Sequence, residues 1–247
     1  ACKCHRGADR RGYNAHNMPG GFDMQRIWKP ILSCLLGALI HLPGLAQAPV
    51  ASAPARPASA VDLNSRLKAI EAEPRQFEAS YKIGRKAAAV CANCHGEGGN
   101  SPRSDTPNLA GQNTAYLLDQ VRQFSEGRRK NEFMEGIMRA LSVDEKIGVA
   151  IFYANQTVVH KPAADAALAA KGKSYYDRTC FRCHGELGMG SEKFARVAGQ
   201  QKDYLAAQLR RYREGKGPRI DPLMAANARN MTDADIDAVV AYVSSMK

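Results

Sequence analysis

Residues 90–100 read VCANCHGEGGN, in which two cysteines stand three positions apart and a histidine directly follows the second. Residues 179–189, TCFRCHGELGM, repeat the arrangement. On one turn of a helix, positions i, i+3 and i+4 lie on the same face, so the three side chains of each motif can reach one flat molecule together. The side chains concerned are Cys91, Cys94, His95, Cys180, Cys183 and His184.

This C-x-x-C-H pattern is the attachment signature of c-type haem. The two cysteines of each motif would bond the vinyl groups of the macrocycle as thioethers, and the histidine would bind the iron. We therefore expect two covalently bound haem c groups, one in each half of the chain. The predicted attachment residues are Cys91, Cys94, Cys180 and Cys183, and the predicted axial ligands are His95 and His184.

Other interpretations of the cysteines explain less. A zinc site would bring together two pairs that lie 89 residues apart, unlike the spacing of compact zinc ribbons. A structural disulfide is possible in an exported protein, and a C-x-x-C pair can also act as a redox dithiol. None of these explains why a histidine occupies the same place twice.

The similarity between the two halves extends beyond the motifs. LAGQ at 109–112 corresponds to VAGQ at 197–200, and the Tyr-Leu pair at 116–117 corresponds to the pair at 204–205. The offset between corresponding positions stays between 88 and 90 residues. Such ordered agreement indicates a duplicated domain.

Each half has the pattern of a helical domain, and no alternating strand pattern of useful length is present. The apolar side chains that predict a helix over 113–126 are Tyr116, Leu117, Val121 and Phe124, and those of the second copy are Tyr204, Leu205, Leu209 and Tyr212. Ser142 with Glu145 predicts a capping box at the start of the closing helix, and Thr232 with Asp235 repeats it. The expected fold class is all-α.

A sixth ligand for each iron is sought among the methionines. Met134 lies seven residues before Leu141, and Met224 lies seven before Met231, which corresponds to Leu141. The matched register favours Met134 and Met224 as the second axial ligands, with Met138 as the runner-up in the first copy. Met189 follows His184 too closely to reach the opposite face, and His160 is expected to be solvated, although it remains an alternative ligand. Histidine–methionine ligation leaves no iron position for a substrate, which favours electron transfer.

The first part of the chain is typical of a leader. We interpret 1–23 as an upstream extension and 24–48 as a signal peptide, with a basic start, an apolar run and a small-residue cleavage site after Ala48. Residues 49–78 follow as a Pro/Ala-rich linker and a short helix, expected at 62–73. The two predicted domains are 79–160 and 161–247. The expected location is the periplasm, with possible peripheral membrane association.

The charge of the chain favours protein partners over nucleic acid. The formal net charge is +11, and +7 without residues 1–48, which hold six basic and two acidic side chains. The densest basic run, 210–213 with Lys216, is typical of a solvated helix face, and the alternative is a docking surface for an acidic redox partner or an anionic lipid. No nucleic acid and no small-molecule substrate is expected.

Segment 79–247 resembles the dihaem c4-type cytochromes, in which two class I cytochrome c domains are fused. The resemblance rests on GxxxAxxCxxCHGxxGNSP from Gly84 to Pro102, on PNLAGQ at 107–112 and on the Tyr-Leu pair after it. It implies tandem class I domains, haem propionates that lie near each other across the interface, and a periplasmic carrier that feeds a terminal oxidase of the haem–copper type. In that family a proline carbonyl usually braces the proximal histidine. Pro107 fits this role, whereas Ala195 stands at the matching position and still offers a carbonyl.

We therefore expect a periplasmic electron carrier between respiratory-chain partners, such as a quinol-oxidising complex and a terminal oxidase. One alternative is a dihaem enzyme of the peroxidase type, which needs an open iron position. Another is a haem-bearing subunit docked on a larger membrane oxidoreductase, with 49–78 as its tether.

Overall fold

A computed structural model of the chain describes residues 62–217 and 219–247. The predicted leader, with the extension before it, and residues 49–61 of the predicted linker lie outside these ranges. Within them the secondary structure is helical and contains no strand, which confirms the all-α expectation. The described residues belong to one compact unit of the chain.

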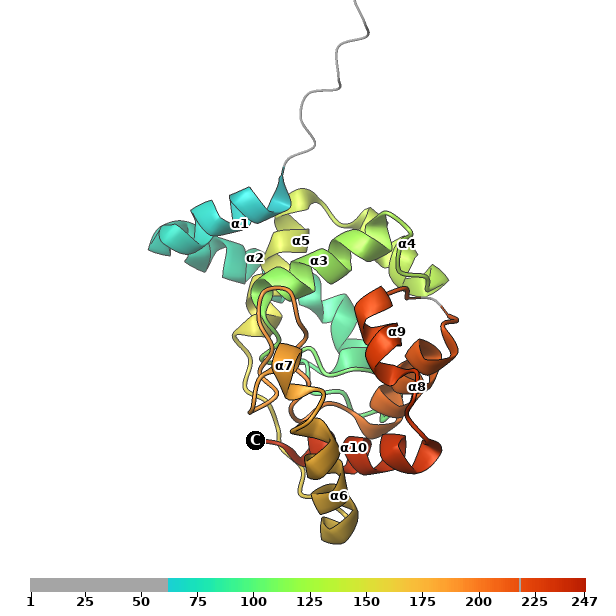
Figure 1. The fold of residues 1–247 in the computed structure, drawn as a ribbon. Coiled ribbons are helices and arrows are strands. Elements are labelled where there is room, and N and C mark those ends of the chain that lie inside the picture. The colour runs from blue at the N-terminus through green and yellow to red at the C-terminus, as the bar shows by residue number, and fades with distance from the viewer. Residues whose placement is uncertain (1–61, 218) are drawn as a thin grey trace, which may run out of the picture. The chain divides into compact units, whose positions relative to one another are not determined.

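Five helices form the first half of the described chain (Figure 1): α1 Leu63–Ala72, α2 Pro74–His95, α3 Thr114–Ser125, α4 Glu132–Ala140 and α5 Val143–Ala154. The long helix α2 starts with Pro74, whose missing N–H costs nothing at the first helical position. It ends where Gly96 adopts a positive φ of 78°. The C-x-x-C-H motif therefore occupies the last turn of α2.

The second half repeats this order with α6 Ala166–Tyr176, α7 Phe181–His184, α8 Lys202–Glu214, α9 Pro222–Ala228 and α10 Asp233–Ser245. The counterpart of α2 is divided here into α6 and α7, and the second motif again ends its helix at a glycine, Gly185, with φ 77°. Both predicted capping boxes are present, at Ser142 with Glu145 and at Thr232 with Asp235.

Each half packs its own apolar core. Helix α2 crosses α5 in the first half, and α6 crosses α10 in the second (Figure 1). Leu118, Ile147 and Ile151 are fully buried in the first core, and Tyr176 and Ile236 in the second. The structure therefore contains two helical domains of the same topology, as the duplication predicted.

The short helix expected at 62–73 is present as α1. Asp62 caps it, and its side chain accepts hydrogen bonds from the backbone N–H groups of Asn64 and Ser65. Leu67 and Ile70 of α1 are buried in the first core, and position 79 lies inside α2. Residues 63–78 thus pack as part of the first domain rather than as a free tether. Among the described residues, no helix has both the length and the apolar character needed to cross a bilayer.

Candidate functional site

The two C-x-x-C-H motifs lie on helical turns in both domains. The N–H of His184 donates to the carbonyl of Cys180 at 3.0 Å, a helical i to i+4 bond. In the first domain the same turn is the end of α2, where the N–H of Gly96 donates to the carbonyl of Ala92 at 2.9 Å. The predicted geometry, in which both cysteines and the histidine share one helical face, is therefore available in both copies.

Each motif histidine is held by a backbone carbonyl at the matching place. His95 Nδ1 lies 2.8 Å from the carbonyl oxygen of Pro107, and His184 Nδ1 lies 2.8 Å from that of Ala195. The carbonyl brace expected from the resemblance is thus kept in the second copy without a proline. It leaves Nε2 as the ring nitrogen available to a metal. Burial lowers the pKa of both histidines, which favours the neutral form that binds metals.

Both motifs line a single cavity of about 690 Å³. Its walls are mostly apolar and include side chains of both cores, such as Leu117 and Phe124 from α3 and Leu209 from α8. The six motif residues Cys91, Cys94, His95, Cys180, Cys183 and His184 all belong to its lining. Large, flat apolar cofactors bind in sites of this kind, which supply apolar walls and a few polar groups.

The predicted methionine ligands also line this cavity, and they occupy equivalent places. Met134 is the third residue of α4, and the side chain of the cap residue Asn131 accepts from its N–H at 2.9 Å. Met224 is the third residue of α9, where Asp221 does the same at 3.0 Å. Met138 also lines the cavity, and its side chain is more deeply buried, but it does not share this capped position.

The remaining candidate ligands lie elsewhere. Met189 is 42% exposed and is not part of the cavity lining. His160 is exposed, and its Nδ1 lies 2.8 Å from the carbonyl oxygen of Met246. His160 therefore ties the segment between the domains to the end of the chain, as expected of a residue outside the site.

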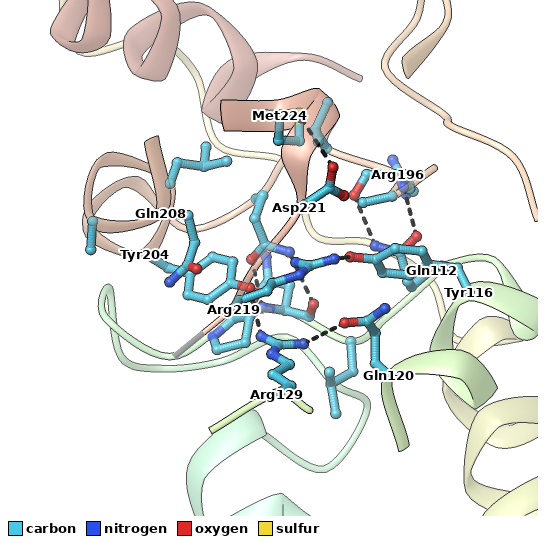
Figure 2. Close-up of a pocket in the computed structure, with 18 of the residues that line it drawn as sticks. Gln112, Tyr116, Gln120, Arg129, Arg196, Tyr204, Gln208, Arg219, Asp221 and Met224 are labelled. Atoms are coloured by element: carbon cyan, nitrogen blue, oxygen red, sulfur yellow. Dashed lines mark hydrogen bonds between the residues drawn. The ribbon is translucent and has the colours of Figure 1, made fainter. Parts of the chain in front are cut away.

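Four arginines line the cavity without forming an ion pair with any carboxylate of the described residues: Arg129, Arg196 and Arg219, and the exposed Arg211. Figure 2 shows two of them reaching across the domain interface. Arg219 donates to the hydroxyl of Tyr116 at 2.6 Å, and Arg129 donates to that of Tyr204 at 3.1 Å. The Nε atom of Arg196 is buried without a hydrogen-bond partner among the described residues.

These residues fit haem c. Arg196 is buried, and Arg129 and Arg219 are partly buried. Cations withdrawn from water favour anionic acceptors, and the carboxylates of a haem would supply them beside these three side chains. The four thiols that would bond its vinyl groups are free in the described chain. Burial raises the pKa of Cys180 to about 11, so this thiol lacks the thiolate character of a redox dithiol. The zinc alternative finds no support, because no three His, Cys, Asp or Glu side chains of the described residues gather as a metal site.

The cavity arginines were not predicted from the sequence. Arg129 and Arg219 are separated by 90 residues, the offset that also relates Met134 to Met224. If the alignment of the two halves had been extended through the loops, Arg129 and Arg219 would have stood at corresponding positions.

The basic run of α8 is partly neutralised, since Arg210 lies 3.2 Å from Asp237 and Arg213 lies 2.9 Å from Asp233. This arrangement favours the interpretation of a solvated helix face.

Comparisons with known proteins agree with this geometry. The family model described as cytochrome c matches residues 169–247. Over 175 residues the chain is 32% identical to cytochrome c4 of Pseudomonas aeruginosa, and the aligned region covers 66% of this chain and 87% of that protein. Over 181 residues it is 35% identical to the thiosulfate dehydrogenase electron acceptor of Thiomonas intermedia, and the aligned region covers 68% of this chain and 83% of that protein. The crystal structure of reduced recombinant cytochrome c4 from Pseudomonas stutzeri superposes with a TM-score of 0.62 at 31% identity, covering 67% of this chain and 98% of that one.

Proposed function

Because this chain belongs to the cytochrome c4 family of dihaem c-type cytochromes, its function is electron transfer, and we propose that it works in the periplasm between redox proteins. The proposed course of the electrons runs from a dehydrogenase or a quinol-oxidising complex towards a terminal oxidase. The observation that supports this most is the matched pair of histidines in one cavity, each braced at Nδ1 by a carbonyl.

The proposed roles of the residues follow from the cavity. Cys91 and Cys94 would hold one haem c, and Cys180 and Cys183 the other. When bound, each haem supplies an iron that accepts and releases one electron. His95 and His184 would bind iron through Nε2, while Met134 and Met224 would bind it from the opposite side. Arg129, Arg196 and Arg219 would hold the carboxylates of the two groups.

With an imidazole and a thioether on each iron, no iron position would remain for a substrate. The chain then orients both haems, excludes water from them with apolar walls, and lets electrons enter and leave without a chemical step on a bound molecule. This argument disfavours a dihaem peroxidase, which needs an open or displaceable site. We also propose the boundary between the domains near residue 160, in the segment that joins α5 to α6.

The identity of the partners is a further part of the proposal. A relative of this chain is named as an electron acceptor of thiosulfate dehydrogenase. A thiosulfate-oxidising dehydrogenase is therefore one candidate donor, beside the quinol-oxidising complex. Stopped-flow mixing of the oxidised holoprotein with each reduced donor would compare them, and the physiological donor should reduce both haems at a rate that increases with its concentration.

The ligand assignment is tested by substituting the methionines of the holoprotein one at a time. Met134→Ala and Met224→Ala should each remove about half of the charge-transfer band between methionine sulfur and ferric iron, with two irons per chain in the parent protein. Met138→Leu is the matched control and should leave the band intact. A parent protein with a high-spin haem, or methionine variants whose spectra do not change, would contradict the electron-carrier proposal.

A further inference from the structure

Three glutamine side chains cross between the domains and bind the backbone of the other domain: Gln112, Gln200 and Gln201. Gln112 and Gln200 each hold both the N–H and the carbonyl of one residue there. Gln200 accepts from the N–H of Asn108 at 2.6 Å and donates to the carbonyl of Asn108 at 3.1 Å. Gln112 accepts from the N–H of Arg196 at 2.6 Å and donates to its carbonyl at 2.8 Å, as Figure 2 shows. Corresponding positions are 88 residues apart in both cases. The interface is thus two-fold pseudo-symmetric.

The peptide group that Gln200 holds is the one that braces the first histidine. The carbonyl of Pro107 and the N–H of Asn108 belong to the same peptide group. His95 Nδ1 lies 2.8 Å from that carbonyl oxygen, and Gln200 Oε1 lies 2.6 Å from that nitrogen. A chain of hydrogen bonds therefore leads from the motif histidine of the first domain to a side chain of the second.

The second histidine is connected in the same way. The carbonyl of Ala195 lies 2.8 Å from His184 Nδ1, and the N–H of the same peptide group, which belongs to Arg196, donates to Gln112 Oε1. The histidine of the second domain is therefore linked to a side chain of the first. Neither glutamine is connected in this way to the histidine of its own domain.

These hydrogen bonds are buried in the interface between the domains. Gln112, Gln200, Asn108 and Arg196 are 7–9% exposed, and hydrogen bonds in such surroundings strengthen one another along a chain. An acceptor on the N–H of a peptide group polarises its carbonyl, which then accepts more strongly from the imidazole. A histidine with a stronger bond at Nδ1 is a more basic ligand. A more basic ligand stabilises ferric relative to ferrous iron and so lowers the reduction potential.

We propose that Gln200 and Gln112 are positioning residues that set the reduction potential of the haem in the opposite domain, each through the peptide group that braces the opposite histidine. This inference rests on the proposed function, because it needs His95 and His184 as iron ligands. It makes the docking of the domains part of the redox chemistry. Each domain lowers the potential of the other for as long as the interface is formed.

The test is a spectroelectrochemical titration of the holoprotein with Gln200→Leu and Gln112→Leu. The two haems are assigned with Met134→His and Met224→His, each of which should move one component only. Gln200→Leu should raise the potential of the haem at His95, and Gln112→Leu that of the haem at His184. The expected change in the ferrous-to-ferric ratio at fixed potential is roughly threefold, or about 28 mV at 59 mV per tenfold change.

A matched control separates this effect from a loosened interface. The hydroxyl of Ser104 donates to the carboxylate of Asp203 across the same interface, but neither side chain is a hydrogen-bond partner of the bracing peptide groups. Ser104→Ala should leave both potentials unchanged. If a leucine variant does not retain its haems, Gln200→Asn or Gln112→Asn withdraws the carboxamide by one methylene without adding an apolar side chain, and the same cross-domain shift is expected.

The outcomes are distinguishable. Spectra that do not change in Met134→His and Met224→His would contradict the ligand assignment, and with it the proposed function. If each methionine variant moves one redox component but the glutamine variants move neither potential, only the glutamine inference is overturned. Glutamine variants that shift both haems equally, or that shift the haem of their own domain, would overturn it as well, because the bonds run only to the opposite histidine.

Discussion

The backbones of Gly84 and Gly148 touch where α2 crosses α5. A Cβ atom at Gly84 would lie 1.9 Å from the carbonyl oxygen of Gly148 and 2.2 Å from its carbonyl carbon. The second domain repeats the contact, since a Cβ at Gly172 would lie 1.9 Å from the carbonyl oxygen of Ala238. In both domains this close crossing fixes the helix that leads to the C-x-x-C-H motif.

Gly84→Ala should destabilise the first domain by about 3 kcal/mol or more, because backbone atoms cannot move aside as a side chain can. Denaturant unfolding of the holoprotein measures the change. Gly136→Ala in α4 is the matched control, since a Cβ there meets nothing within 4 Å. It should stabilise the helix by about 0.5–1 kcal/mol. Equal stabilities of the two variants would contradict the close crossing.

Arg219→Leu should lower the reduction potential of the holoprotein. The guanidinium lines the cavity, and a positive charge in a poorly solvated site disfavours ferric iron relative to ferrous iron. At an effective dielectric constant of about 20, removal of the charge should change the oxidation equilibrium by on the order of 1 kcal/mol. Redox titration provides the measurement. Arg85→Leu, an exposed substitution on α2, should have no such effect, and a similar shift in both variants would argue against a role for Arg219.

The capping box of α10 should contribute stability that depends on pH. Hydrogen bonds from the side chain and the backbone of Thr232 lower the pKa of Asp235. The ionised Asp235 carboxylate therefore adds its full share to the free energy of unfolding above the pKa of an unfolded aspartate, about 3.9. That share is lost as the pH falls through the lower pKa of the folded state. Thr232→Ala should cost about 1 kcal/mol at neutral pH. Thermal unfolding at several pH values should show this cost becoming smaller below about pH 4, and a cost that grows in acid would contradict the box.

His160→Ala should leave the absorption spectrum of the holoprotein unchanged, because His160 is exposed and is not part of the cavity lining. The loss of its hydrogen bond to the carbonyl of Met246 should cost about 1 kcal/mol of stability. Spectra and denaturant unfolding of the same preparation check both statements. A changed spectrum would restore His160 as a candidate ligand.

Features that repeat along the chain could be predicted from the sequence. The helical spacing of α3, the two capping boxes and the duplication all depend on neighbours within a few turns, or on comparison of one half with the other. The same holds for the motif turns of Cys91 and Cys180. The ligand roles of Met134 and Met224 remain predictions, supported by their matched places in the cavity.

Other features required the packed structure. The sequence contains Gln112 and Gln200 as corresponding positions of the repeat, but corresponding residues do not have to touch. The structure pairs each with the backbone four residues before the other. In the same way, Arg129 and Arg219 are ordinary loop cations until the two domains close a common cavity around them.

By itself, the sequence determined two helical domains with a C-x-x-C-H turn in each, because the period of a helix and the preferences of its caps are local properties of the chain. The tertiary structure alone decided that each histidine is linked to a glutamine of the other domain. Such contacts join residues more than 80 positions apart, and they depend on how two separately folded surfaces fit together, which no local pattern specifies.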